Sequence, residues 1–185
     1  MSHTEAAAKA VMGQLTLPAW RLRALSIQGL LLVSAALLLP AAAHLTGLPV
    51  RVLLPMHWPV ILVGLCYGWR SGALVGLVSP GVSFLLSGMP LPAILPAMTL
   101  ELAAYGFLAG FFRETLRLSR PLSTALSLLG GRVLFVAFVG ATGAVNVPIP
   151  EYLKLALLPG LASALGQFLL LPLAAGWWVR REQRK

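Results

Sequence analysis

Six apolar stretches, separated by short polar or basic turns, occupy most of the chain. A helix rises about 1.5 Å per residue, so about 20 apolar residues are needed to cross a hydrocarbon core of about 30 Å. In chain order the stretches are residues 25–46, 55–68, 71–88, 92–112, 122–145 and 152–179, and the second is the shortest. The pattern therefore predicts an all-α integral membrane protein, built as a bundle of six transmembrane helices.

The apolar stretches divide the chain into three parts. Residues 1–24 are polar to mixed and are predicted to form a cytoplasmic N-terminal segment, with a short surface helix at AAAKAV. Residues 25–179 form the transmembrane domain, and residues 180–185 form a basic cytoplasmic tail. Proline interrupts helical hydrogen bonding, so we expect a kink at Pro40 and a break near Pro59.

Basic residues are distributed unevenly among the turns, and this predicts the orientation in the membrane. With the N-terminus in the cytoplasm, all 14 Lys and Arg residues except Arg51, Arg132 and Lys154 fall in cytoplasmic segments. Cytoplasmic loops of membrane proteins carry such an excess of positive charge. We therefore expect both termini in the cytoplasm, as an even number of spans requires.

Composition also indicates a multi-pass protein of the cell membrane, surrounded by the lipid bilayer. Hydrophobic residues make up 58% of the chain and charged residues 10%, with a mean hydropathy of +0.87. Soluble domains contain about 25% charged residues. The net charge of +9 is attributed to topology signals and contacts with lipid headgroups, so no nucleic-acid partner is expected.

Glu101 is the most informative polar residue, because it lies in the apolar run PAMTLELAAYGFLAGFF. A charge inside a membrane is tolerated mainly where it faces a partner charge, a ligand or the interior of a bundle. Arg132 is the only other formal charge comparably deep in an apolar stretch. Met98, Glu101 and Tyr105 are spaced i, i+3 and i+7, so they share one helical face.

Four more polar or aromatic residues are candidates for the same site. His57 and Trp58 lie at the outer start of the second stretch, Asn146 at the outer end of the fifth, and Gln167 midway along the sixth. We expect several of these to line a cavity open to the outside. Two interpretations stay open: Glu101 and Arg132 pair only to hold helices together, or at least one of them contacts a ligand. His57 has its own alternative, as a solvated or helix-capping residue.

Known enzyme motifs are absent from the sequence. It contains no HExxH, CxxC, GxSxG or P-loop motif. One cysteine and three scattered histidines do not make a structural metal site. We therefore expect no enzymatic activity, no metal and no cofactor, and the chain has no nucleotide site with which to couple ATP hydrolysis by itself.

Several runs resemble the substrate-binding S components of energy-coupling factor (ECF) vitamin transporters. The similarity covers roughly residues 25–178, and its most specific parts are Met56-His57-Trp58-Pro59-Val60, the glycine-rich turn that follows, Gly88-Met89-Pro90, Glu101 with Tyr105-Gly106, and Pro159-Gly160 with Gln167. The resemblance implies six helices and a bound vitamin or related micronutrient. It also implies a transmembrane coupling protein and two cytoplasmic ATPases as partners. Pantothenate, a corrin and a modified base all fit the pattern.

Small residues suggest where a coupling protein would dock. Family members commonly carry an Ala-xxx-Ala motif in the first helix, whereas this chain has only Ser26 and Gly29 as small residues on one side. Gly64, Gly68, Gly72 and Gly76 recur at every fourth position near the inner ends of the next two helices. Such spacing lets helices approach closely. We expect ordinary packing within the bundle, and also a close-approach surface for long partner helices.

Two other functional classes remain as alternatives to a binding subunit. An autonomous proton-coupled carrier would use Glu101 as its titrating group, although the two halves of the chain show no inverted repeat. An intramembrane enzyme would need paired acids, bases or metal ligands, which the sequence lacks.

Overall fold

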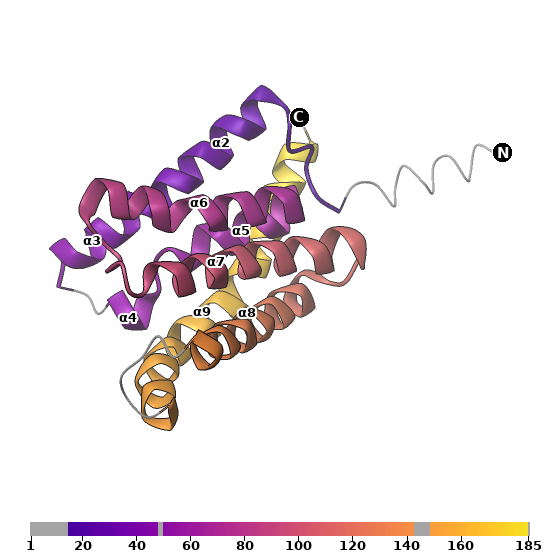
Figure 1. Ribbon diagram of the computed structural model, residues 1–185. Helices are drawn as coiled ribbons and strands as arrows, with labels where there is room; N and C mark the ends of the chain where they lie inside the picture. Colours follow the sequence, from indigo (N-terminus) through magenta and orange to yellow (C-terminus); the bar gives the residue numbers. More distant parts are fainter. Residues whose placement is uncertain (1–14, 48–49, 143–148, 185) are drawn as a thin grey trace.

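The computed structural model describes residues 15–47, 50–142 and 149–184, and every regular element in these ranges is helical (Figure 1). The predicted surface helix at residues 6–11 and Asn146 lie outside the described residues. The elements are α2 (Leu22–Val33), the π-helical turn η1 (Ser34–Leu38), α3 (Leu39–Leu45), α4 (Val50–Leu53), α5 (His57–Tyr67), α6 (Trp69–Ser87), α7 (Leu95–Gly110), the π-helical turn η2 (Phe111–Thr115), α8 (Arg120–Thr142) and α9 (Ile149–Gln183).

The predicted all-helical membrane architecture is confirmed. Within the described residues, five helical stretches are long and apolar enough to cross a membrane: Leu22–Leu45, Trp69–Ser87, Leu95–Thr115, Arg120–Thr142 and Leu158–Gln183. The sixth helix of the predicted set is α5, which is apolar but has only 11 residues. The orientation of the termini stays a prediction.

Helix α5 is shorter than the predicted stretch 55–68. At 11 residues it extends about 16 Å and does not reach across a hydrocarbon core by itself. Its bounds have local causes, because Leu54 has φ 46° just before the helix and Gly68 has φ 90° just after it. Pro59 lies in the first turn, where a missing N–H breaks no helical bond, so it does not interrupt the helix.

The first span changes its winding in the middle. Helix α2 passes through η1 into α3, which carries Pro40 in its first turn. Proline has no N–H to donate to the carbonyl four residues earlier, and its ring crowds that carbonyl. The wider π-helical turn directly before Pro40 accommodates the missing donor and the crowded carbonyl. The disturbance predicted at Pro40 is therefore a change from α-helical to π-helical winding.

Helices α5, α6 and α7 pack against one another as the centre of the bundle (Figure 1). Their glycines permit this, because a Cβ on Gly72 would overlap the backbone of Gly106, and a Cβ on Gly106 would overlap that of Gly72. Gly64 and Gly76 are similarly closed off by the backbone of α7. The packing interpretation of the glycine series is therefore right. The expectation that the same glycines form a surface for partner helices is wrong, because they are buried inside the bundle.

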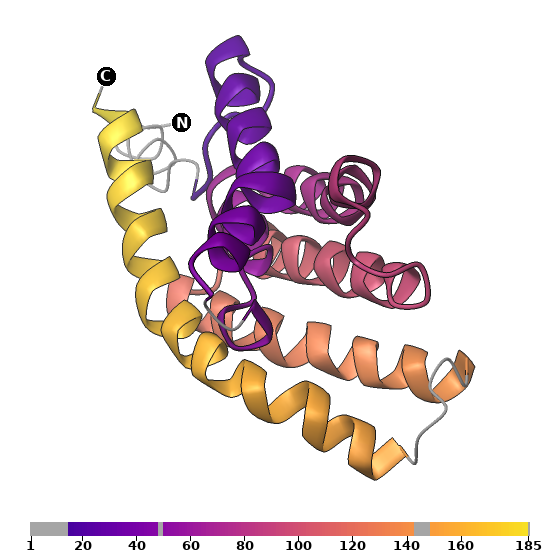
Figure 2. The ribbon, with the colours of Figure 1, turned by 90° about the vertical axis from the view of Figure 1, so that its left-hand side faces the viewer.

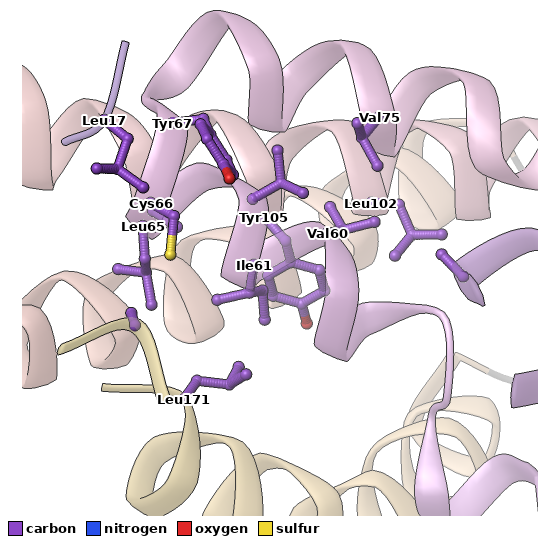
Figure 3. Close-up of a cluster of buried hydrophobic side chains, with 14 of the residues drawn as sticks. Leu17, Val60, Ile61, Leu65, Cys66, Tyr67, Val75, Leu102, Tyr105 and Leu171 are labelled. Atoms are coloured by element: carbon purple, nitrogen blue, oxygen red, sulfur yellow. The ribbon is translucent and has the colours of Figure 1, made fainter. Parts of the chain in front are cut away.

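Large apolar side chains fill the space between α5, α7 and α9. Ile61, Tyr105 and Leu171 are among the buried residues there, as Figure 3 shows. Helix α9 has 35 residues and runs along one side of the bundle (Figure 2). Its last turns reach the start of α2, where Arg23 Nη2 lies 3.1 Å from Glu182 Oε1. The core thus holds α5 in a fixed position, with its first residue, His57, facing α7.

We predict that Gly72→Ala destabilises the bundle by about 1–3 kcal/mol, because the added methyl group meets backbone that cannot move aside. Gly81→Ala is the matched control in the same helix, since a Cβ on Gly81 meets no atom within 4 Å. Thermal unfolding in detergent measures both variants. Equal melting temperatures for the two would contradict the close crossing of α6 and α7.

Candidate functional site

Three polar and aromatic side chains meet around the carboxylate of Glu101. Arg132 Nη1 lies 2.8 Å from Glu101 Oε1 and forms an ion pair with it. The Tyr105 hydroxyl donates a hydrogen bond of 3.1 Å to the same oxygen. His57 Nε2 lies 3.9 Å from this oxygen, which is too long for a hydrogen bond. This group is called the Glu101 cluster below.

Three helices supply the Glu101 cluster. Helix α7 carries Glu101 and Tyr105 one turn apart, so both side chains leave the same face. Helix α8 contributes Arg132 from its middle, and α5 contributes His57 from its first position. The predicted common face of α7 and the pairing of its carboxylate with α8 are therefore both present in the structure.

Two glycines make room for the large side chains of the cluster. A Cβ on Gly131 would overlap the ring of Tyr105. A Cβ on Gly160 of α9 would lie 2.7 Å from Arg132 Nη2 and 3.2 Å from Leu54 Cδ1. The guanidinium group therefore lies between α7 and the backbone of α9, and a side chain at position 160 would displace it.

Burial differs between the two members of the ion pair. The Glu101 side chain is 5% exposed, whereas that of Arg132 is 22% exposed. Burying a charge is costly unless it is paired and hydrogen-bonded, and Glu101 has both kinds of partner. Arg132 offers five N–H donors in a planar fork, and only Nη1 is used by Glu101. The cluster can thus present further donors to an acceptor group on its accessible side.

His57 is buried without using its polar atoms. Neither ring nitrogen has a hydrogen-bond partner among the described residues. The ring instead packs edge-on against Tyr105, with centroids 5.1 Å apart and an interplanar angle of 60°. A buried polar group without a hydrogen bond costs free energy, and most such groups in proteins have a partner. His57 therefore has one donor and one acceptor available in its neutral form.

A second polar network lies beside the cluster and converges on the Leu53 carbonyl. This oxygen accepts hydrogen bonds from Trp58 Nε1 at 2.9 Å and from Ser163 Oγ at 2.6 Å. Gln167 Nε2 donates to Ser163 Oγ at 2.9 Å. The network fastens the connection between α4 and α5 to α9, directly before His57.

Trp58 also borders an apolar groove of about 320 Å³ between the first span, α5 and α9. Leu31, Leu62 and Leu170 line it as well. Trp58 thus has different neighbours from His57, although the two residues are adjacent in the sequence.

The eight residues predicted for the site do not form one group. His57, Glu101, Tyr105 and Arg132 come together. Trp58 and Gln167 belong to the network on the Leu53 carbonyl, Met98 packs against the apolar core, and Asn146 lies outside the described residues. Ser163 and Gly160 were not predicted for the site. Small residues three positions apart in an apolar helix are nevertheless a signal that another helix or side chain approaches closely.

The Glu101 cluster has no metal-binding character. Among the described residues, no three His, Cys, Asp or Glu side chains gather closely enough to hold a metal ion. The arrangement instead suits recognition by hydrogen bonds and charge, with Arg132 as donor and His57 as donor or acceptor.

We predict that Glu101→Gln lowers stability by about 3 kcal/mol, because it leaves the guanidinium of Arg132 partly buried without its counter-charge. Adding Arg132→Met should restore most of the loss, since an apolar pair needs no counter-charge. Melting temperatures of the two single variants and the double variant form the measurement, read as a double-mutant cycle. Purely additive losses would show that the ion pair does not stabilise the fold.

Comparison with known proteins identifies the family. A sequence model of the ECF transporter substrate-specific component matches residues 23–179, which is most of the chain and includes the whole Glu101 cluster. A search of curated proteins and a search of solved structures found no match. Members of this family are transporter subunits and not enzymes, and they reside in the cell membrane. The chain therefore belongs to the substrate-specific S components of ECF transporters, as a membrane-embedded subunit that binds the transported substrate.

Proposed function

We propose that this S component captures a vitamin or related micronutrient from outside the cell at the Glu101 cluster. Partner subunits, namely a transmembrane coupling protein and two cytoplasmic ATPases, would then supply the energy for uptake. The observation that carries the proposal is the combination of an ion pair whose carboxylate is buried with a buried histidine whose ring nitrogens have no hydrogen-bond partner among the described residues. Such a group favours a ligand with its own polar atoms over purely structural packing.

The position of the cluster along the helices supports capture from outside. His57 begins α5, Glu101 lies about 9 Å from the start of α7, and Arg132 lies about 15 Å from the end of α8. The start of α7 and the end of α8 lie opposite the basic turn between α7 and α8, and α5 begins inside the bundle, beside Tyr105. Because the basic turns are expected in the cytoplasm, the cluster is nearer to the external surface.

The contacts of Arg132 and His57 favour one part of the ligand in particular. A guanidinium fork binds carboxylate, phosphate or carbonyl oxygens well. The Phe135 ring, whose centroid lies 5.8 Å from Arg132 Cζ, and the ring of Tyr105 provide apolar walls beside it. We therefore expect a substrate with an acceptor group directed at Arg132 and an apolar or aromatic body.

An autonomous proton-coupled carrier fits these observations less well. Protonating Glu101 would leave Arg132 without its ion-pair partner each time a proton is carried, which is costly at this depth. Family membership points in the same direction, because S components are subunits of larger transporters.

The first span offers the surface on which the coupling protein would dock. It is the least buried of the five long spans, and Ser26 and Gly29 both lie exposed on it. Ser26 Oγ donates to the Leu22 carbonyl within its own helix, and a Cβ on Gly29 would meet no atom within 4 Å. A partner helix would therefore approach the backbone of α2 closely at this point.

We predict that His57→Phe lowers substrate affinity by about tenfold or more, because the ring nitrogens are lost while the aromatic contact with Tyr105 remains. The ligand is the small molecule released from the purified protein on denaturation and identified by mass spectrometry. Isothermal titration of this molecule into the substrate-free subunit gives the affinity. His44→Phe is the control, because His44 is exposed on α3. This variant should bind the substrate with the affinity of the wild type. Unchanged affinity for His57→Phe would exclude this residue from the site.

We also predict that Gly29→Leu weakens assembly with the coupling module while substrate affinity stays within about twofold, because a bulky side chain would separate the helix backbones. Gly140→Leu is the matched control, another exposed helical glycine with no atom within 4 Å of its Cβ position. A pull-down with the module measures assembly, and uptake into proteoliposomes measures transport. Full assembly of Gly29→Leu with the coupling module would show that the docking face lies elsewhere. Uptake by the isolated subunit would overturn the proposed function itself.

A further inference from the structure

Two arginines flank the turn where α7 ends and α8 begins. Arg113, in η2, is only 6% exposed and donates from Nη1 to the Leu118 carbonyl at 2.7 Å. Arg120, the first residue of α8, is partly buried and lies against the backbone of Gly176 in α9. The Arg113 guanidinium is thus held against the backbone two residues before Arg120.

Several polar atoms of this group have no hydrogen-bond partner among the described residues. These atoms are Arg113 Nε, Arg120 Nε and Ser123 Oγ, and all three are buried. Ser123 lies one turn beyond Arg120 on α8, so both side chains leave neighbouring positions on the same face. Buried donors without acceptors are rare in proteins because each costs free energy.

The carboxylates in the described part of the chain are engaged elsewhere. Glu101 pairs with Arg132 and Glu182 with Arg23. Glu114 is exposed and accepts a hydrogen bond of 3.1 Å from the backbone N–H of Trp69. Glu151 lies in the first turn of α9, at the other end of α8 and α9. Neither Arg113 nor Arg120 therefore has a counter-charge among the described residues.

The location of the arginines is a membrane surface. The candidate spans Leu95–Thr115 and Arg120–Thr142 both have an end here, so the turn between them lies at the depth of lipid headgroups. The N-terminal end of α8 adds a partial positive charge, which favours an anion. Arg120 is partly exposed, so a ligand at the membrane surface reaches its guanidinium group first.

We propose that Arg113, Arg120 and Ser123 form a binding site for a phosphate group, separate from the Glu101 cluster. A phosphate diester or free phosphate accepts hydrogen bonds from both guanidinium groups and from the serine hydroxyl, and its negative charge offsets their two positive charges. The phosphate comes either from an anionic phospholipid of the bilayer or from solution, and both sources present the same acceptor oxygens.

The test uses the full chain in detergent, with native mass spectrometry to measure lipid retention. Phosphatidylglycerol and phosphatidylcholine are supplied in equal amounts, and a separate thermal-shift series compares inorganic phosphate with chloride at matched ionic strength. Selective retention of phosphatidylglycerol identifies a lipid source. Stabilisation by inorganic phosphate, without selective lipid retention, identifies a source in solution.

Arg120→Gln should reduce the observed binding about tenfold, because it removes one charged fork from the phosphate. Arg117→Gln is the matched control, an exposed arginine in the same turn that should bind as the wild type does. Arg120→Lys keeps the charge but loses the planar fork, and it replaces the glutamine variant if that variant does not fold. It should also bind the phosphate group more weakly than the Arg117→Gln control. Equal losses for positions 117 and 120, or no selective binding of either phosphate source, would overturn the site.

Discussion

The ion pair between Glu101 and Arg132 joins α7 to α8 within the membrane-spanning part of the bundle, at a distance of 2.8 Å. A carboxylate in this setting needs both a counter-charge and hydrogen bonds, and the surrounding structure provides them. Tyr105 adds a hydrogen bond from one turn further along α7. Because the pair takes one nitrogen of Arg132 and leaves that side chain partly exposed, the same interaction that stabilises the fold leaves donors for a substrate.

Close backbone contact makes this arrangement possible. Gly72 and Gly106 bring α6 directly against α7, while Gly131 and Gly160 leave room for Tyr105 and Arg132. The short helix α5 is surrounded by these elements and begins with His57, whose ring packs on Tyr105. The packing of the bundle and the geometry of the cluster thus depend on small residues. A methyl group at Gly72 or Gly106 would meet backbone, and one at Gly131 or Gly160 would meet the side chain of Tyr105 or Arg132 directly.

The sequence predicted the helical membrane architecture and the central charges, because long apolar runs and intramembrane charges have few physical explanations. It did not predict that α5 would stop at 11 residues, since φ values such as that of Leu54 are not visible in a hydropathy pattern. Nor did it predict that Trp58 and His57 contact different groups of residues, because their side-chain directions depend on where α9 packs. The network of Ser163 with the Leu53 carbonyl was invisible for a similar reason, since backbone acceptors leave no trace in a sequence.

The family shows that the chain is an S component. The burial of Glu101 and the hydrogen-bonding capacity left on Arg132 and His57 support our proposal that its substrate site lies between α5, α7 and α8. The most direct measurement is an experimental structure of the subunit with the substrate that it retains from cells. Our account predicts polar atoms of that substrate within about 3 Å of Arg132 or His57, with the Glu101 ion pair intact. A substrate bound elsewhere, for example in the apolar groove beside Trp58, would contradict it.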